Sequence, residues 1–371
     1  MASISRRPNG MYRARYRDPD GKEHARHFPR KMDAQRWLDE VTASVLTGQY
    51  VHPRAGDITF KAYAEDWRTR AGHRTSTADL VERHLRNHVY PVLGDRRLKN
   101  VQPADVQGLD KALAASLAPS TAATVRKFVS AVFADAVRNR KIPTSPCTPV
   151  RAPRPARTKV VPLDTPVVTA LRDAAPERMR ALVITAAGTG LRQGELFGLT
   201  LDRINFLRRE VVVNRQLVSV AGSMPTFGDV KTETSNRTVP LPQVVIDALS
   251  AHLARYPTEP DALVFTNSRG GPQRRSSFND SWAATCERAG VGRVRFHELR
   301  HYYASLLIRR GANVKVVQAR LGHKTAQETL DTYSHLWPDD DDRTREAVDA
   351  VLGAQDADSA DSVRTGASAA G

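Results

Sequence analysis

Hydrophobic residues at the start of the chain follow the two-residue period of a β-strand. In the first such stretch, tyrosine and alanine side chains alternate strictly with Arg13, Arg15 and Arg17, so the three arginines are expected on one face of the strand. A Pro-Asp-Gly turn sequence follows, and after it come a second strand pattern and a helical pattern. The expected elements are strands over 11–17 and 23–28 and a helix over 32–46. Residues 1–55 are therefore predicted to form a small module, a β-hairpin or sheet packed against one helix.

A helical period dominates the next segment, 57–147. Its predicted exposed faces are basic and include Arg83, Arg126 and Lys127. Helices are predicted over 60–71, 76–88, 103–114 and 118–138, the last capped by Ser120 and Thr121. This segment is predicted to be an all-α domain. Residues 148–162, rich in proline and arginine, are expected to be an extended basic linker.

Helical and strand patterns alternate in the third segment, 163–340. Helices are expected over 164–174, 176–187 and 277–289, and strands over 210–213, 216–220 and 237–241, with a loop over 221–229. Gly311 and Gly322 break a run of further helices up to residue 336. Residues 341–371 are predicted to hold a helix over 343–352, which should dock on another surface, and a disordered tail. The predicted fold class is α+β and multidomain, with a mainly α third domain that contains a small antiparallel sheet.

The composition indicates a polyanionic binding partner. The chain of 371 residues carries a formal net charge of +16, and its basic residues occur in every segment, which favours nucleic acid over a purely solubilising charge. Cys147 and Cys286 are too few for a disulfide framework or a cysteine zinc site. No apolar run approaches the roughly 20 residues of a membrane span, and the basic N-terminus lacks the apolar segment of a signal peptide. A cytoplasmic protein with no membrane partner is therefore expected.

Chemically active side chains are concentrated between residues 294 and 336. His297 and Arg300 lie three residues apart in an amphipathic pattern and should share one helix face. His323 follows a glycine break, and Tyr333 lies in a further short helix. A phenol that attacks a phosphate, a guanidinium that holds its oxygens and imidazoles that move protons suffice for covalent phosphoryl transfer. Each of these residues alone also fits an ordinary place in a core, a helix cap or a solvated face.

Five short motifs occur in an order that is typical of one family. They are TGLRQGE at 189–195, KTETSNRTVPL at 231–241, HELRH at 297–301, LGH at 321–323, and Tyr333. Together they resemble the tyrosine recombinases of the phage-type integrase family, over about residues 163–336. The helical segment resembles that family's core-type DNA-binding domain, although it ends in Ser-Pro where Asn-Pro is common. The N-terminal module resembles the family's arm-type DNA-binding domain.

The resemblance implies a role for each motif residue. Tyr333 would attack the scissile phosphate and form a 3′-phosphotyrosine. Arg192 and Arg300 would hold the two non-bridging oxygens, which suits the planar fork of arginine. The remaining roles are protonation of the leaving 5′-oxygen by Lys231, removal of the tyrosine proton by His297, a hydrogen bond to the phosphate from His323, and support from Glu195 and His301. No metal and no other cofactor is expected, because these cations can neutralise the transition state.

The same resemblance implies double-stranded DNA attachment sites as the substrate and a tetramer of the chain assembled on two of them. An excisionase or other directionality factor and a DNA-bending host factor are further partners that it allows. The expected DNA contacts outside the catalytic motifs are Arg13, Arg15, Arg17, Arg83, Arg126 and Lys127. Two alternatives stay open, a type IB topoisomerase that relaxes DNA and a non-catalytic DNA-binding protein.

Overall fold

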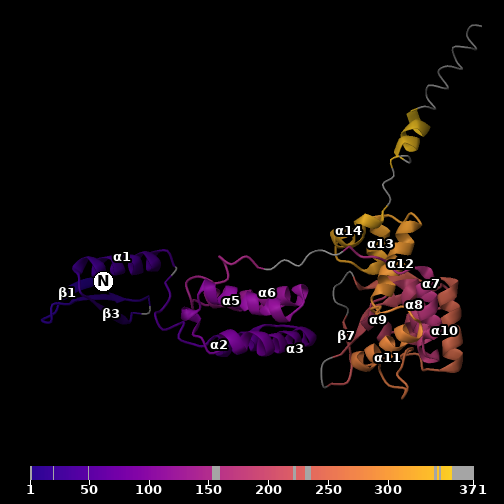
Figure 1. The fold of residues 1–371 in the computed structure, drawn as a ribbon, viewed down its shortest axis with the longest axis horizontal. Coiled ribbons are helices and arrows are strands. Elements are labelled where there is room, and N and C mark those ends of the chain that lie inside the picture. Colours follow the sequence, from indigo (N-terminus) through magenta and orange to yellow (C-terminus); the bar gives the residue numbers. More distant parts are fainter. Residues whose placement is uncertain are drawn as a thin grey trace, which may run out of the picture. The chain divides into compact units, whose positions relative to one another are not determined.

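The computed structural model describes residues 2–19, 21–48, 50–152, 159–219, 223–229, 235–337, 341 and 344–352. The chain divides into two compact units, Met1–Arg157 and Thr158–Gly371. The first unit contains a small sheet module and a helical body with separate hydrophobic cores, and the second contains the remaining elements (Figure 1). Among the described residues, none of the helices combines the length and the apolar character needed to cross a membrane.

The N-terminal module is a three-stranded antiparallel sheet covered by one helix. Its elements are β1 (Ser3–Arg6), β2 (Tyr12–Arg17), β3 (Glu23–Phe28) and α1 (Lys31–Leu46), with the strand order β1-β2-β3. The sequence predicted β2, β3 and α1 but not β1, which pairs with β2 from Ser3 opposite Arg15 to Arg6 opposite Tyr12. Ile4 is the only apolar residue of β1, so this strand shows no alternation from which it could be predicted.

Side-chain alternation along β2 separates a buried face from a basic face, as predicted. Ala14 and Tyr16 are buried in the core that the sheet forms with α1. The three arginines lie on the other face, where the guanidiniums of Arg13 and Arg15 approach the carboxylate of Glu23 at 3.7 and 3.8 Å. The basic face therefore belongs to the middle strand of a sheet and not to a two-stranded ribbon.

The helical body contains every helix that the sequence predicted. Its elements are α2 (Phe60–Arg70), α3 (Thr75–His84), the π-helical turn η1 (Leu85–Val89), α4 (Tyr90–Leu93), the 3-10 turn η2 (Leu98–Asn100), α5 (Pro103–Ser116) and α6 (Pro119–Arg138). Two local predictions are wrong. The helix expected over 76–88 changes to π-helical geometry at Leu85. Ser120 and Thr121 do not cap α6, which begins at Pro119 without a side-chain cap, because proline suits the first position of a helix.

Arg126 of α6 is not the exposed DNA contact that the sequence predicted. Only 1% of its surface is accessible. Its Nε lies 3.1 Å from the Asp110 carboxylate, and its Nη1 donates a hydrogen bond to Ser130 at 2.5 Å. The prediction fails because these partners satisfy the guanidinium inside the helical body. Lys127, about a quarter turn further round α6, is exposed, and so is Arg83 of α3.

The second unit is mainly helical, with two small antiparallel sheets. Its helices are α7 (Thr165–Ala174), α8 (Glu177–Thr189), α9 (Gln193–Phe197), α10 (Gln243–Arg255), α11 (Arg275–Arg288), α12 (Glu298–Arg309), α13 (Val314–Leu321) and α14 (Ala326–Tyr333), with 3-10 turns η3 (Leu201–Arg203) and η5 (Ser334–Leu336). One sheet has the order β4-β5-β8, from β4 (Ile204–Asn205), β5 (Glu210–Val213) and β8 (Arg237–Pro240); the other pairs β6 (Arg215–Val218) with β7 (Thr226–Asp229). Strand β7 lies where the sequence predicted a loop over 221–229, because pairing with β6 imposes the strand conformation.

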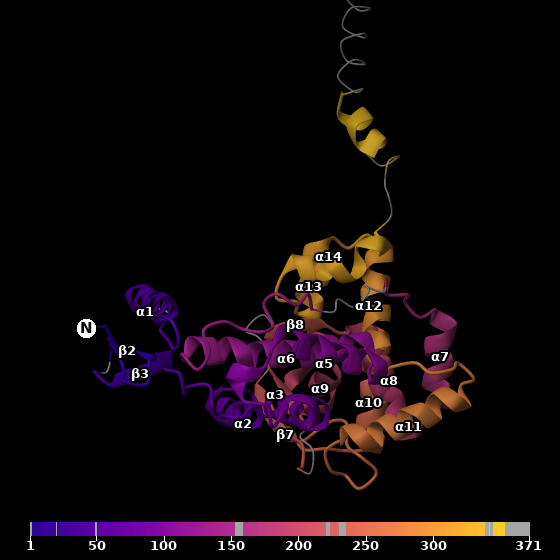
Figure 2. The ribbon, with the colours of Figure 1, turned by 60° about the vertical axis from the view of Figure 1, so that its left-hand side comes forward.

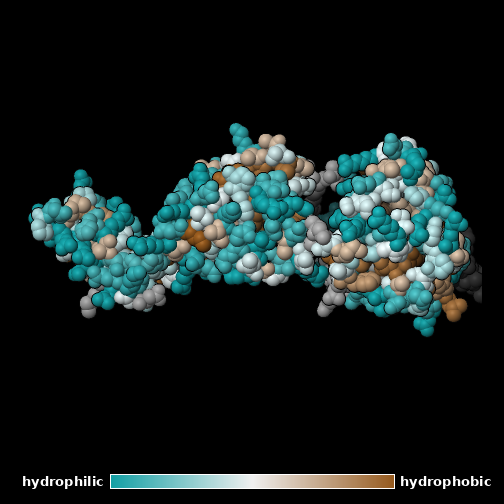
Figure 3. Space-filling view, turned by 90° about the horizontal axis from the view of Figure 1, so that it is seen from below, coloured by the Kyte–Doolittle hydropathy of each residue, from teal (hydrophilic) through white to brown (hydrophobic). Residues whose placement is uncertain are grey.

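Apolar side chains of α7, α8, α10, α11, α12 and the β4-β5-β8 sheet form the core of the second unit. The faces of both units seen in Figure 3 are mostly hydrophilic, as the net charge of +16 suggests. Residues 344–352 are helical, within the last predicted helix, and Val348, Val351 and Leu352 are at least half exposed. The predictions for the middle of the linker (153–158) and for the tail after residue 352 lie outside the described residues.

Candidate active site

One buried guanidinium joins three helices of the second unit. Helix α12 contacts α8 and α13 (Figure 2). Arg300, in the first turn of α12, is 3% exposed and donates hydrogen bonds to the carbonyl oxygens of Gly190 at 2.7 Å and Leu321 at 2.6 Å. These carbonyls lie at the C-terminal ends of α8 and α13, where the partial negative charge of a helix end favours a cation. Arg300 is therefore fixed at the point where the three helices meet.

Glycine residues make this meeting possible. Gly190 and Gly322 cap α8 and α13 with φ values of 64° and 65°, a left-handed conformation that favours glycine. A Cβ atom on Gly190 would lie 2.4 Å from Cδ1 of Tyr303, and one on Gly322 would lie 3.0 Å from Nη1 of Arg237. The caps turn the chain and leave room for the side chains of the site.

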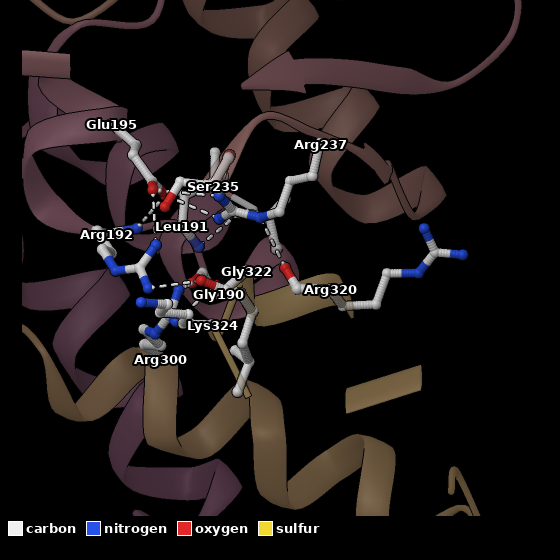
Figure 4. Close-up of polar contacts among 12 residues, drawn as sticks. Gly190, Leu191, Arg192, Glu195, Ser235, Arg237, Arg300, Arg320, Gly322 and Lys324 are labelled. Atoms are coloured by element: carbon white, nitrogen blue, oxygen red, sulfur yellow. Dashed lines mark hydrogen bonds and ion pairs between the residues drawn. The ribbon is translucent and has the colours of Figure 1, made fainter. Parts of the chain in front are cut away.

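Arg192 is held beside Arg300 by Glu195 and by the second glycine cap. Arg192 precedes α9, and its Nη1 lies 3.0 Å from Oε1 of Glu195, while its Nη2 donates to the carbonyl oxygen of Gly322 at 2.9 Å (Figure 4). This is not an ordinary surface ion pair, because Glu195 is only 4% exposed. The Arg192 side chain itself remains 27% exposed, so a ligand can reach it.

Arg237 is part of the site and was missed by the sequence analysis. It is the first residue of β8, and its Nη2 lies 2.8 Å from Oε2 of Glu195, while its Nε donates to the carbonyl oxygen of Arg320 at 2.9 Å. Burial alone would raise the pKa of Glu195, but the hydrogen bond from Arg237 and the charges of Arg237 and Arg192 outweigh it and lower that pKa. The only signal for Arg237 in the sequence is its place in the motif at 231–241, because a basic residue in a short strand is ordinarily solvated.

The cluster of guanidiniums in this site is suited to binding an anion. Arg192 and Arg237 both pair with one carboxylate, that of Glu195, and Arg300 lies next to them (Figure 4), so positive charge is in excess. Burial, and next the charge of Arg192, lower the pKa of Arg300 to about 9, which keeps the guanidinium protonated at neutral pH. A bound phosphate would reduce the repulsion between these cations.

The hydroxyl of Tyr333 contacts an imidazole. Tyr333 is the last residue of α14 and is 1% exposed, and its hydroxyl oxygen lies 2.7 Å from Nδ1 of His301. Burial raises the pKa of Tyr333 to about 12, against the opposing charge of Arg300. Burial, and next Arg300, lower the pKa of His301. Both groups are therefore neutral at pH 7, with the phenol as donor. The sequence analysis assigned this contact with the tyrosine to His297.

Two further histidines complete the cluster. His297 lies immediately before α12, and its ring centroid is 5.0 Å from that of His301, edge to face. Burial, and next the nearby His301, lower the pKa of His297 to about 4. His323 lies 2.8 Å from the Thr329 hydroxyl through Nδ1, and burial lowers its pKa to about 3. Both imidazoles are neutral at pH 7, so each has one donor and one acceptor nitrogen.

The structure brings most of the predicted site residues together. The residues that share the site are Arg192, Glu195, His297, Arg300, His301, His323 and Tyr333. Lys231 lies outside the described residues. Arg13, Arg15, Arg17, Arg83 and Lys127 belong to the first unit and not to this site.

Comparison with known proteins identifies the family. Residues 163–339 match the phage integrase family, residues 2–47 match the phage integrase N-terminal domain and residues 60–153 match the phage integrase central domain. Among curated proteins, the chain is 28% identical over 340 residues to the prophage phiRv2 integrase of Mycobacterium tuberculosis, covering 88% of this chain and 89% of the relative. It is 27% identical over 356 residues to a XerC-like tyrosine recombinase of Caldanaerobacter subterraneus, covering 87% and 90%.

Solved structures share the fold. The Tn1549 transposon integrase in complex with a circular intermediate DNA matches with a TM-score of 0.67 at 20% identity, covering 79% of this chain and 99% of that one. A lambda integrase tetramer bound to a Holliday junction matches with a TM-score of 0.57 at 17% identity, covering 88% and 96%. The α+β multidomain fold class is confirmed. With its motifs in family order and its relatives matched over most of their length, the chain belongs to the phage-type integrase family of tyrosine recombinases, as a site-specific recombinase of phage or mobile-element integration.

Proposed function

We propose that this recombinase cuts each DNA strand by transesterification at Tyr333. The phenolic oxygen attacks the scissile phosphorus, a 3′-phosphotyrosine bond forms, and the bond to the 5′-oxygen breaks to release a 5′-hydroxyl. The observation that carries the proposal is the 2.7 Å contact between the Tyr333 hydroxyl and an imidazole, His301. The reverse reaction with the 5′-hydroxyl of another strand restores a phosphodiester, so the exchange conserves the bond energy and consumes no nucleotide.

The guanidinium cluster would hold the phosphate. Arg192 and Arg300 are the proposed ligands of the non-bridging oxygens, since each guanidinium has N–H groups beyond those used for the carbonyls and Glu195. Arg237 contacts Glu195 and a backbone carbonyl, so we assign it the task of positioning the cluster. Charge that develops on the pentavalent phosphorane is stabilised best by such preorganised donors.

Proton transfer would involve the histidines and Lys231. His301 is the proposed acceptor of the Tyr333 proton, because it is the imidazole in contact with the hydroxyl and its lowered pKa leaves it neutral. His297 and His323 are proposed to hydrogen-bond the phosphate. Lys231 is proposed as the acid that protonates the leaving 5′-oxygen, an assignment that depends on the motif at 231–241.

Tyr333→Phe is expected to abolish the covalent adduct with DNA and to leave DNA binding intact. A nicked core-site duplex from the junctions of the encoding element traps the adduct, which a denaturing gel resolves, and a native gel measures binding. Tyr303→Phe is the matched control, because Tyr303 is 7% exposed and lies in the same core cluster as Tyr333. An adduct with Tyr333→Phe at the wild-type yield would assign the nucleophile to another residue.

The other segments are proposed to bind the DNA around this site. Residues 1–55 would form the arm-type domain and read distal sites through Arg13, Arg15 and Arg17, and residues 57–147 would hold the core site, with Arg83 and Lys127 near its phosphates. Residues 148–162 would link that domain to the catalytic domain at 163–340, and the helix within 341–371 would dock on a neighbouring protomer. The protein would assemble as a tetramer on two attachment sites in the cytoplasm. A directionality factor and a DNA-bending factor would be its further partners.

A further inference from the structure

A buried hydroxyl contacts one imidazole of the site from the helix that carries Tyr333. Thr329 of α14 is 0% exposed, and its Oγ1 lies 2.8 Å from Nδ1 of His323. Thr329 lies one helical turn before Tyr333, so the two side chains share a face of α14. The ring of His323 in turn stacks on that of Tyr333, with 6.4 Å between centroids and 10° between planes. Thr329 therefore joins this imidazole to the helix of the proposed nucleophile.

The hydroxyl of Thr329 has no other acceptor among the described residues. A threonine inside a helix commonly donates to the carbonyl oxygen one turn earlier, as Thr332 does to Glu328 at 2.9 Å. Thr329 forms no such bond, and its only side-chain hydrogen bond in the described part of the chain is the one to His323. Because a buried hydroxyl proton needs an acceptor, Thr329 is the donor of this bond and Nδ1 of His323 is the acceptor.

The direction of this hydrogen bond determines which nitrogen of His323 carries a proton. An Nδ1 that accepts has no proton of its own, so the neutral ring carries its proton on Nε2. Protonation of the ring would add a proton at Nδ1 and leave the one on Nε2 in place. Nε2 has no hydrogen-bond partner among the described residues and is not enclosed, and the charges of Arg300 and Arg192 act on the ring. A ligand of the guanidinium cluster can therefore use Nε2–H as a donor.

We propose that Thr329 is a positioning residue for DNA cleavage, a role that rests on the proposed function, in which His323 hydrogen-bonds the scissile phosphate. Thr329 fixes the imidazole as a donor that faces a non-bridging oxygen through Nε2. The other tautomer would present a lone pair to that anion and would not bind it. Because Thr329 and Tyr333 belong to one helix, α14 orients the nucleophile and this donor together. Thr329 is fully buried and acts through His323 alone.

Nitrogen NMR of the full-length protein, labelled with ¹⁵N-histidine, tests the tautomer without a cleavage reaction. Protonated and unprotonated ring nitrogens differ widely in chemical shift, and the signals of His323 are those that His323→Ala lacks. The wild-type protein is expected to carry the proton on Nε2 of His323. Thr329→Ser, which keeps the hydroxyl, should give the same shifts. Thr329→Val should leave Nδ1 without a donor and give a mixture of the two tautomers.

Single-turnover cleavage of a nicked core site tests the positioning role. Thr329→Val should slow adduct formation about 3- to 10-fold, as expected for the loss of one ordinary hydrogen bond, and Thr329→Ser should keep the wild-type rate. Thr332→Val is the matched control, because the Thr332 hydroxyl bonds only the backbone of the same helix, next to Tyr333. It should cleave at the wild-type rate. In a His323→Ala background, Thr329→Val should cause no further loss, because its effect passes through the imidazole.

Three results would overturn the proposal. A proton on Nδ1 of His323 in the wild-type protein would show that Thr329 accepts the hydrogen bond. A wild-type cleavage rate with Thr329→Val would show that the bond does not matter for the reaction. Equal slowing by Thr329→Val with and without His323 would show that the hydroxyl only supports the packing of α14, which thermal melting of each variant measures. Failure of the proposed function is distinguishable from these results, because an adduct with Tyr333→Phe would leave the tautomer of His323 unchanged.

Discussion

Tyr333 and His301 meet as two neutral groups, and their pKa values disfavour ionisation of the tyrosine in the unbound protein. The pKa of Tyr333 is raised to about 12, and that of His301 is lowered from 6.5. Transfer of the proton from Tyr333 to His301 in the unbound protein is therefore strongly unfavourable. In the proposed reaction, attack becomes accessible only when a phosphate lies against the guanidiniums, because the new phosphorus–oxygen bond then removes the tyrosinate as it forms. In the proposed mechanism, this arrangement keeps Tyr333 protonated until DNA is bound.

The proton acceptor can be identified from the pH dependence of adduct formation. Protonation of His301 removes its acceptor lone pair, so the rate should fall toward acid pH. Because burial and Arg300 lower the pKa of His301, the fall should begin below pH 6.5. His301→Ala should slow single-turnover cleavage by about 10²- to 10⁴-fold and should make the remaining rate independent of pH on the acid side. His297→Ala should also cleave slowly but should keep the acid limb.

If His297→Ala loses the fall in rate toward acid pH and His301→Ala keeps it, His297 and not His301 is the proton acceptor. Sequence spacing could not separate these two histidines, because both lie within one turn of Arg300 in the motif at 297–301. Only the packing of α14, which brings Tyr333 to His301 and not to His297, distinguishes them.

At the scale of elements, the ends of α8 and α13 have to meet α12 for Arg300 to be held. Gly190→Ala should break this meeting, because its φ is 64° and the new Cβ would lie 2.4 Å from Tyr303. The left-handed strain should cost about 1–2 kcal/mol, and the overpacking a further 1–3 kcal/mol or so. Cleavage should fall as well, since the Gly190 carbonyl holds Arg300. Urea denaturation of the second unit and single-turnover cleavage measure the two effects.

Gly311→Ala is the control for that substitution. Gly311 follows α12 with a φ of 80°, and no atom lies within 4 Å of a Cβ placed there. The free energy of unfolding of the Gly311→Ala protein should therefore fall by the left-handed strain alone, about 1–2 kcal/mol. Its cleavage rate should be unchanged. Equal effects of the two substitutions on stability and cleavage would mean that the clash with Tyr303 does not matter.

The positions of most helices were predictable from the sequence, but strand pairing and contacts between distant side chains were not. Periodicity predicted α1, α6 and α7 to within a few residues, because each has a continuous apolar stripe. Strands β1 and β7 were missed, because their short polar sequences become strands only by pairing. The same limit applies to side chains. In the sequence, Arg126 and Arg237 have the pattern of solvated cations, and only the fold brings Asp110 and Glu195 to them.

At the scale of the whole molecule, we expect the sheet module and the proposed catalytic site to have separable tasks. Deletion of residues 1–55 should leave cleavage of a nicked core site unchanged, because every catalytic motif lies beyond residue 188. The same deletion should abolish recombination that depends on distal arm sequences. Both activities can be measured with one DNA pair that carries or lacks the flanking arms. Loss of core-site cleavage in the truncated protein would show that the module also contributes to the catalytic assembly.

The basic face of the module should account for this dependence on the arms. Arg13, Arg15 and Arg17 share one face of β2, with Glu23 beside two of them, and phosphates or base edges must replace that carboxylate on binding. Replacing all three with alanine should weaken arm binding. Each arginine that reads a base edge should contribute about 1–3 kcal/mol to this loss. Replacing an arginine that binds only a phosphate should instead reduce the slope of log K against log[salt] by roughly 0.9. Arg26→Ala is the control, because Arg26 lies opposite Ala14 on the face toward α1. Filter binding at several salt concentrations separates the two kinds of interaction, and equal binding by the triple variant and Arg26→Ala would assign arm recognition to another surface.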